Sequence, residues 1–311
     1  MHPVYSVIVP CYNEEAVIRE THKRLTQVFQ SMEEAYEIIY VNDGSRDRTG
    51  EILREIAMED PCARAVLFAR NSGQEMAITA GLDYASGDAI ILIDADLQDP
   101  PELIPQMAAR WKKGVQMIYA QRKDRAGESA FKKVTASVYY KFLDWLTDGV
   151  APRDTGNFRL VDKQVVDVIR GMPEHNRFLR GMFSWAGFTR EPVFYDRQER
   201  FAGETEYTLK KMLKLAADGI FSFSVKPLKF ITGLGVSFLG LAGVMLLVLL
   251  IALIFGAGSG LWWLAMLMIG LSGCVLSALG IVGEYIARIY DETRGRPLYI
   301  VADAVGFEDE K

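Results

Sequence analysis

The sequence has few residues of the kinds that build disulfide frameworks or zinc clusters. Among 311 residues it contains three cysteines and three histidines. The cysteines, Cys11, Cys62 and Cys274, lie too far apart along the chain to predict either kind of site. The histidines show no ligand spacing, so we expect them to be structural or surface residues. A reducing compartment is the expected environment.

An excess of positive charge is also absent. The formal net charge is −5, so the overall charge does not attract the protein to nucleic acid, and we expect no nucleic-acid partner. Half of the residues are apolar. The chain is long enough for one folded domain of about 200 residues and a further segment.

The most informative absence is that of Asp, Glu, Lys and Arg between Phe230 and Gly283. Because a membrane helix needs about 20 apolar residues, this run is long enough for two spans joined by the turn Phe255–Gly260. A buried apolar hairpin in a soluble protein is the less favoured alternative. The turn carries no charge, whereas both flanks are basic, so the positive-inside rule places both flanks in the cytoplasm. The flanking basic residues are Lys226, Lys229, Arg288, Arg294 and Arg296.

Apolar runs that suit strands alternate with helical stretches over the first hundred residues. The expected strands begin at Tyr5, Tyr36, Ala63 and Asp88, and the expected helices are about Glu14–Met32, Thr49–Glu59 and Gln74–Ala85. Each strand is a continuous apolar run, which indicates a mostly parallel sheet covered by helices on both faces. The predicted fold class is therefore α/β, and ligands are expected at the carboxyl ends of the strands.

Polar residues follow four of these strands, and the sharpest pattern is Asp94 and Asp96 after the fourth. Two residues apart on a strand, their side chains can point the same way. Carboxylates packed together repel each other, and Mg²⁺ or Mn²⁺ relieves that repulsion with oxygen ligands, often completed by a substrate phosphate. We therefore predict a divalent metal site; a solvated strand end is the alternative. The other polar strand ends are Asn13 with Glu14, Asn42 with Asp43, and Asn71.

The segments "SVIVPCYNEE", "VNDGSRDRT", "IDADLQDPPELI" and "TGNFRLVD", with the two apolar spans, resemble the family-2 glycosyltransferases of GT-A (Rossmann-like) fold. More narrowly, the chain resembles the polyisoprenyl-phosphate glycosyltransferases, which include bactoprenol glucosyltransferases and are akin to dolichol-phosphate mannose synthase. The resemblance covers nearly the whole chain. It implies transfer of one sugar, with inversion, from a nucleotide sugar to undecaprenyl phosphate at the inner membrane. UDP-glucose is the favoured donor, UDP-N-acetylglucosamine and GDP-mannose stay open, and a homo-oligomer is a candidate assembly.

The resemblance also assigns roles to residues of the donor site. Asp43 would hold the base or ribose of the nucleotide. Asp94 and Asp96 would bind a metal ion that bridges the donor diphosphate, with help from Gln98. The residues that would border the nucleotide are Pro10, Tyr12, Asn13 and Glu14. Many relatives have "NFGKE" where this chain has "NSGQE", so no cationic donor contact is carried over to Gln74.

The acceptor phosphate needs cationic groups near the membrane, and arginine offers a forked donor suited to phosphate. The resemblance places two arginine-containing segments there, and ordinary surface arginine is the alternative for each residue. The four candidates are Arg122, Arg125, Arg197 and Arg200. The basic amphipathic stretch Thr208–Phe221 is expected to be a helix lying in the membrane interface, with a core helix of the soluble domain as the alternative.

The stretch "DTGNFRLVDK", which begins at Asp154, is read as a turn ahead of a short helix near Asp162–Arg170. Several relatives have an acid where Asn157 stands, and there it is proposed as the catalytic base. Asn157 cannot take a proton, so Asp154 is the remaining candidate, either as a base or as a structural acid. A phosphate monoester is mostly a dianion at pH 7 because its second pKa is near 6. We therefore expect this turn to orient donor and acceptor, with Asn157 bound to a sugar hydroxyl or a phosphate.

The predicted organisation has four parts. Residues 1–207 form the cytoplasmic GT-A domain, 208–229 the amphipathic juxtamembrane segment, 230–287 the transmembrane hairpin and 288–311 a cytoplasmic tail. Two other functions are weighed against lipid-linked transfer. A processive polysaccharide synthase usually carries Q-x-x-R-W, and the nearest match, Gln106–Trp111, is one residue too long. A non-catalytic membrane scaffold would not need Asp43, Asp94 and Asp96.

Overall fold

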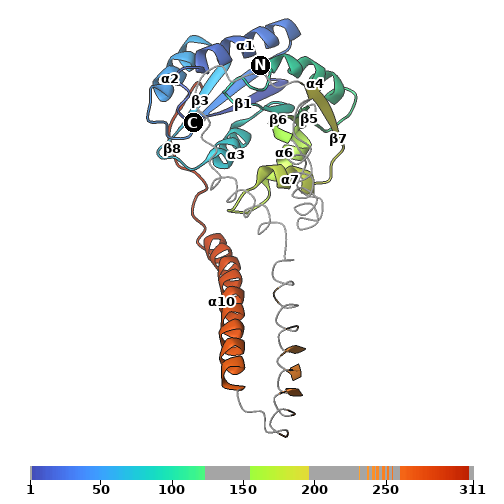
Figure 1. Ribbon diagram of the computed structural model, residues 1–311. Coiled ribbons are helices and arrows are strands. Elements are labelled where there is room, and N and C mark those ends of the chain that lie inside the picture. Colours follow the sequence, from blue (N-terminus) through green and yellow to red (C-terminus); the bar gives the residue numbers. More distant parts are fainter. Residues whose placement is uncertain are drawn as a thin grey trace.

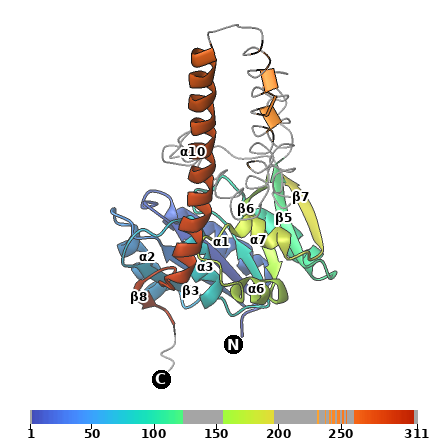
Figure 2. The same ribbon diagram turned by 90° about the horizontal axis from the view of Figure 1, so that it is seen from below.

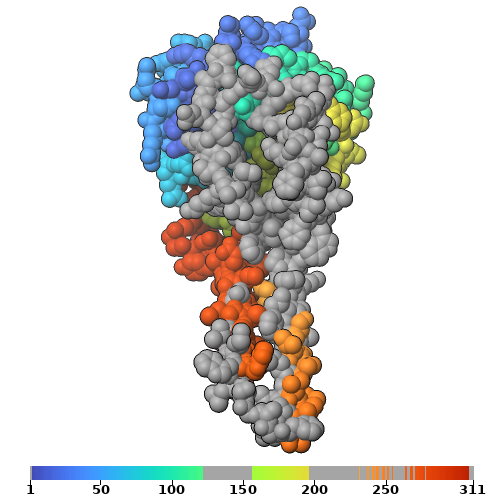
Figure 3. Space-filling view, viewed as in Figure 1, coloured from blue at the N-terminus to red at the C-terminus, as the bar shows by residue number. Residues whose placement is uncertain are grey.

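The computed structural model describes residues 2–122, 155–195 and 260–307, and ten residues between 231 and 254. An α/β head and a long helix, α10 (Gly260–Thr293), are its two main parts. The helix projects away from the head (Figures 1 and 3). Asp154 and the amphipathic stretch Thr208–Phe221 lie outside the described residues.

The head is built on one eight-stranded sheet in the order β7-β5-β6-β4-β1-β2-β3-β8. Four of its seven strand pairings are parallel, including those that join β4, β1, β2 and β3. The parallel centre predicted from the sequence is therefore confirmed. The strands are β1 (Tyr5–Cys11), β2 (Tyr36–Asn42), β3 (Ala63–Phe68), β4 (Ala89–Leu92), β5 (Met117–Arg122), β6 (Thr155–Asp162), β7 (Arg190–Tyr195) and β8 (Val301–Val305).

Helices cover both faces of the sheet, as continuous apolar strands require. One face packs against α1 (Ile18–Met32), α2 (Thr49–Glu59) and α4 (Ile104–Trp111), which follows the short 3₁₀ turn Pro101–Leu103. The other face packs against α3 (Gln74–Tyr84), α6 (Lys163–Arg170) and α7 (Leu179–Trp185). The helices of this second face lie on the side of the head from which α10 extends (Figure 1).

The reading of residues 155–162 as a turn is wrong, because they form β6. This strand lies between β4 and β5 and is antiparallel to both. Phe158 and Leu160 are fully buried in the core, but Asn157 and Arg159 are also buried, each about 4% exposed. These two polar side chains interrupt the apolar run by which the other strands were recognised.

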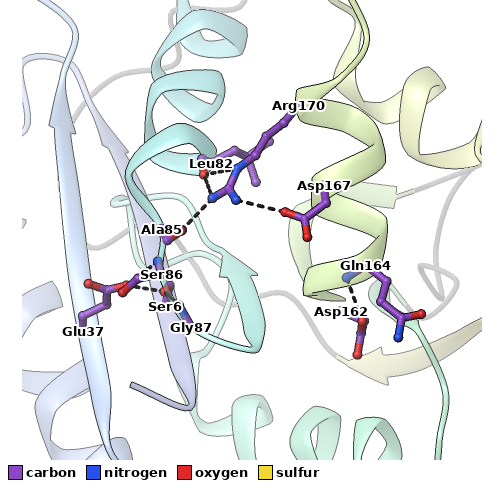
Figure 4. Close-up of polar contacts among 10 residues, drawn as sticks. All are labelled: Ser6, Glu37, Leu82, Ala85, Ser86, Gly87, Asp162, Gln164, Asp167 and Arg170. Carbon is purple, nitrogen blue, oxygen red and sulfur yellow. Dashed lines mark hydrogen bonds and ion pairs between the residues drawn. The ribbon is translucent and has the colours of Figure 1, made fainter. Parts of the chain in front are cut away.

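A pair of polar clusters fixes helices and loops on the sheet (Figure 4). Arg170, at the end of α6, donates from Nε to the carbonyl of Leu82 at 2.9 Å and from Nη2 to that of Ala85 at 2.6 Å. Its guanidinium therefore supplies donors to carbonyls at the end of α3, where intrahelical donors run out. On β2, the buried Glu37 accepts from Ser86 N at 2.8 Å and from the Ser6 hydroxyl. Together the clusters tie α3, β1 and β2 to neighbouring elements.

Among the described residues, one helix is long and apolar enough to cross a membrane. It is the part of α10 from Gly270 to Thr293, and none of its apolar window is buried within the protein. Nine of the ten described residues between 231 and 254 are helical and exposed, and the tenth, Ile231, is helical and half-buried. The two-span hairpin stays a prediction.

The segment after α10 returns to the head and completes the sheet, which the sequence did not predict. β8 pairs antiparallel with β3, as seen from below in Figure 2. Tyr299 stacks on Phe68, with ring centroids 5.1 Å apart, and its hydroxyl donates to Asp83 at 2.8 Å. Arg54 pairs with Asp303 at 2.9 Å. The C-terminal end of the long helix is therefore held to the domain by a strand and by side chains.

Replacing Tyr299 with alanine is expected to lower the free energy of unfolding of the head by roughly 2–3 kcal/mol, because a half-buried stacked ring is lost. Tyr299→Phe keeps the stack and loses only the hydrogen bond to Asp83, which costs about 1 kcal/mol. Thermal unfolding in detergent measures both. An alanine variant as stable as the wild type would mean that the segment after α10 does not hold the head.

Candidate active site

The carboxyl ends of β1, β2 and β4 meet at one edge of the sheet, because these strands are parallel and adjacent. This brings together the loops that carry Asn13, Asn42 and Asp94. The sequence predicted that these polar strand ends would lie in register. Pro10, Tyr12 and Glu14 are partly exposed at the same edge, so the residues expected to border a nucleotide share one region.

Hydrogen bonds brace the loop after β1 against the loop after β2. Asn13 has a positive φ of 56°; its backbone N–H donates to the Ser45 hydroxyl at 3.0 Å, and its side-chain oxygen accepts from Arg46 N at 2.9 Å. Glu14 N donates to the Thr49 hydroxyl at 2.8 Å. Asn13 therefore shapes the loops, and this left-handed conformation is one that Asn tolerates better than most residues.

Asp43 holds the loop that follows β3. Its carboxylate oxygens accept from Ser72 N at 2.6 Å and from Gly73 N at 2.9 Å. Burial raises the pKa of Asp43, and these two backbone hydrogen bonds oppose the rise. A contact with a nucleotide base or ribose, as the sequence predicts, would have to share oxygens that already accept hydrogen bonds from the backbone.

Three carboxylates gather after β4. Asp94 is partly exposed, and burial raises its pKa to about 6, followed by the negative charges of Asp99 and Asp96. The sequence predicted such mutual repulsion for Asp94 and Asp96. Asp96 accepts from Gln98 N at 3.2 Å, and the buried Asp99 accepts from the hydroxyl of Tyr195. The loop is thus folded so that negative charge accumulates at one point.

The donor set after β4 fits a hard divalent cation. Oδ1 of Asp94 accepts two hydrogen bonds, whereas Oδ2 accepts none from the described residues. No group of three or more His, Cys, Asp or Glu side chains within the described ranges could enclose a metal ion. A cation held by Asp94 and Asp96 would therefore complete its shell with water and substrate oxygens, as Mg²⁺ commonly does.

Asn157 of β6 connects Asp94 to Arg180 of α7. Its Nδ2 donates to Asp94 Oδ1 at 3.2 Å, and its Oδ1 accepts from Arg180 Nε at 2.9 Å. The amide is 4% exposed, so its hydrogen bonds are inside the protein. Sequence reasoning missed Arg180, because nothing in its neighbours marks it as facing Asp94.

Arg159 pairs locally rather than with a carboxylate of the strand ends. Its guanidinium donates to the carbonyls of Asn157 at 3.2 Å and Gly156 at 3.0 Å, and it lies 5.0 Å from the ring centroid of Phe183. Burial, and then the charge of Arg180, lowers its pKa to about 10, so it stays charged at pH 7. Arg159 and Arg180 also line a small pocket with Tyr119 and Arg190.

Arg122 is the last residue of β5. It is the one candidate acceptor residue that the structure describes. The other three, Arg125, Arg197 and Arg200, lie outside the described residues, as does Asp154. The predicted phosphate site and the candidate base are therefore still predictions.

Comparison with known proteins identifies a family model, curated relatives and a solved structure that this chain resembles. The family model for Glycosyl transferase family 2 matches residues 6–170. The uncharacterized glycosyltransferase YkcC of Bacillus subtilis (strain 168) is 49% identical, over 100% of this chain and 97% of its own length. The prophage bactoprenol glucosyl transferase homolog of Escherichia coli (strain K12) is 39% identical, over 95% of this chain and 97% of its own length. A crystal structure of glucosyl-3-phosphoglycerate synthase from Mycobacterium tuberculosis matches with a TM-score of 0.48 and 21% identity, over 70% of this chain and 78% of that one.

Proposed function

Because the chain belongs to glycosyltransferase family 2, we propose that it transfers a single sugar from a nucleotide sugar to undecaprenyl phosphate, a polyisoprenyl phosphate. The chain is a glycosyltransferase; the acceptor, the donor and the inverting course are the proposal. Glucose from UDP-glucose is the favoured sugar, supported by relatives named bactoprenol glucosyl transferase that are 37–39% identical to the chain. The reaction would take place at the cytoplasmic face of the inner membrane.

The structural observation that carries the proposal is that the long apolar helix α10 contacts the head directly. An apolar helix with none of its spanning window buried suits a lipid environment better than water. Its last turn meets the head, where Glu292 accepts from the backbone N–H of His175 at 2.7 Å. A transferase for a water-soluble acceptor needs no such helix, whereas a lipid phosphate is reached only at a membrane.

In this proposal Asp94 and Asp96 hold Mg²⁺ or Mn²⁺ with the donor diphosphate. Such a cation, when bound, neutralises the negative charge that grows on the departing nucleoside diphosphate. The residues of the chain bind and orient the substrates. Asp43 holds the loop before α3, and Asn13 shapes the loops around the nucleotide. Arg122, Arg125, Arg197 and Arg200 would bind the acceptor phosphate.

We expect Asp154→Asn to lower turnover by less than about tenfold. General-base assistance is worth about 10²–10⁴-fold where a proton must be removed, but a phosphate monoester is mostly a dianion at pH 7. Initial rates at saturating donor and acceptor measure the effect. A loss above about a thousandfold, with donor binding intact, would instead make Asp154 the general base.

The function is tested in detergent with radiolabelled nucleotide sugars, undecaprenyl phosphate and Mg²⁺. We expect one lipid-linked sugar per acceptor, loss of transfer when EDTA removes the cation, and recovery when Mg²⁺ or Mn²⁺ is added in excess. A long polymer would identify a processive synthase instead. Absence of transfer from UDP-glucose, UDP-N-acetylglucosamine and GDP-mannose would overturn the proposed acceptor.

A further inference from the structure

Two elements of the head donate hydrogen bonds to one oxygen, Oδ1 of Asp94, and a third element supports one of the two donors. Gln74, the first residue of α3, donates to it from Nε2 at 2.9 Å. Asn157 of β6 donates to it from Nδ2 at 3.2 Å. Arg180 of α7 completes the chain of contacts through the Asn157 side-chain oxygen, at 2.9 Å. None of these three contacts lies within a single element, so the tertiary fold makes them.

We propose that Gln74 and Asn157 are positioning residues, which hold Asp94 through Oδ1 and leave Oδ2 for a divalent cation and the donor. Arg180 is the residue that sets the orientation of the Asn157 amide. The inference rests on the proposed function only for the role of Asp94 toward a cation and a nucleotide sugar. It assigns Asn157 to Asp94 rather than to a sugar hydroxyl or an acceptor phosphate.

The chemistry of the neighbours fixes which way the Asn157 amide faces. A guanidinium only donates hydrogen bonds, and an ionised carboxylate only accepts them. Placed between Arg180 and Asp94, an amide satisfies both only if its oxygen faces Arg180 and its NH₂ faces Asp94. The opposite orientation would put two acceptors together at Asp94 and two donors together at Arg180.

Neutral amides suit this position because Asp94 already has acidic neighbours. Asp96 and Asp99 lie in the same loop, and their charges act on Asp94. A third acid at residue 157 would face Oδ1 of Asp94 directly and repel it. A cation at residue 74 would pair with Asp94 and compete with a metal ion for its charge. Two amides hold the carboxylate without adding charge of either sign.

The elements that carry Gln74 and Asn157 are joined to each other by hydrogen bonds outside the site. Arg170 joins the end of α6 to the carbonyls that end α3 (Figure 4). α6 follows β6 directly, and Asp162 accepts from Gln164 N at 2.9 Å to begin that helix. Glu75 accepts from Leu179 N at 2.9 Å, which joins the start of α3 to the start of α7. The two amides therefore come from elements that are fixed to one another.

A charge-exchange experiment tests the inference. Gln74→Lys is expected to weaken Mn²⁺ binding by about 10–100-fold, since the new ammonium pairs with Asp94. Asn157→Asp is expected to lower kcat by about 10–100-fold without abolishing Mn²⁺ binding, since repulsion turns Asp94 away. In the double variant the introduced lysine can bridge both acids, so Mn²⁺ affinity and kcat should each return to within about threefold of wild type.

Mn²⁺ binding is measured by electron paramagnetic resonance with UDP present and without acceptor, and thermal unfolding is recorded for every variant. The matched control is Gln27→Lys, at an exposed position of α1, which should change neither kcat nor Mn²⁺ affinity. The inference would be overturned if the losses of the two single variants multiplied in the double variant, with no recovery of kcat or Mn²⁺ affinity. It would also be overturned if Gln74→Lys bound Mn²⁺ as tightly as the wild type. A wild type that binds Mn²⁺ yet makes no lipid-linked sugar would sink the proposed function alone.

Discussion

Asp94→Asn is expected to abolish sugar transfer, with turnover lowered by at least about a thousandfold, which corresponds to about 4 kcal/mol of lost transition-state stabilisation. The same result is expected for Asp96→Asn. An asparagine keeps the size of the side chain and can still accept from Gln74 and Asn157. It lacks the negative charge that a cation and a leaving diphosphate require. Rates with Mg²⁺ in excess, together with UDP binding, measure the loss.

The stability of Asp94→Asn should not fall with its activity. Burial raises the pKa of Asp94 from 3.8 to about 6, so the folded state binds this proton more tightly than the unfolded state. The free energy of unfolding therefore falls as pH rises through that window, and at pH 7 the ionised carboxyl costs stability. We expect the Tm of Asp94→Asn to equal or exceed that of wild type.

The matched control for this prediction is Asp88→Asn, since Asp88 is exposed and contacts His2 at 3.4 Å. It should leave activity unchanged. If Asp94→Asn lost activity only in parallel with its Tm, the carboxylate would be a structural residue. Retained turnover would remove Asp94 from the metal site altogether.

Two arginines in the middle of α10 are expected to prevent the helix from entering a membrane. Leu276 and Leu279 are 69% and 61% exposed. In water, an exposed leucine can become arginine with little effect on stability. In the centre of a bilayer each arginine costs about 2.5–3.5 kcal/mol of insertion free energy. The double variant Leu276→Arg, Leu279→Arg therefore distinguishes a helix in water, where it has little effect, from a helix in a bilayer, where it opposes insertion.

The measurement is the share of protein that stays in the membrane after alkaline extraction, with transfer to undecaprenyl phosphate as a second readout. Ile300→Arg is the control, because Ile300 is 47% exposed but lies beyond α10, on the segment that returns to the head. It should remain in the membrane fraction. A double arginine variant that does the same would mean that α10 does not span the bilayer.

The parallel centre of the sheet was predictable because its strands consist almost entirely of buried apolar residues. β6 was not, since Asn157 and Arg159 occupy buried positions where the pattern calls for apolar side chains. β8 alternates half-buried and exposed residues, so it lacks the continuous apolar run by which the central strands were recognised. It forms because β3 offers an edge and because Tyr299 packs on Phe68. Contacts between residues so far apart in the chain cannot be predicted from the local sequence.

The candidate site was also predictable in part: its carboxylates were, and the side chains that contact them were not. The spacing of Asp94 and Asp96 after a buried strand predicted a carboxylate cluster, and the raised pKa of Asp94 agrees with it. Gln74 and Asn157 are two of the positions where the sequence departs from the patterns of the family it resembles. They lie 83 residues apart and contact the same oxygen. Only the folded structure shows that Gln74 and Asn157 are neighbours, and that Arg180 donates to Asn157.

If α10 spans the membrane as proposed, its last turns would act as a rigid spacer that sets the height of the active site above the bilayer. The apolar run ends at Gly283, and the helix continues to Glu292, which binds the head. In that arrangement these turns would hold the head roughly 12–14 Å from the hydrocarbon, about twice the depth of a headgroup layer. One added residue would raise the head by about 1.5 Å and also rotate it by about 100°. Height and orientation are therefore coupled, and among small insertions only one of about seven residues, two nearly whole turns, would change the height and keep the orientation.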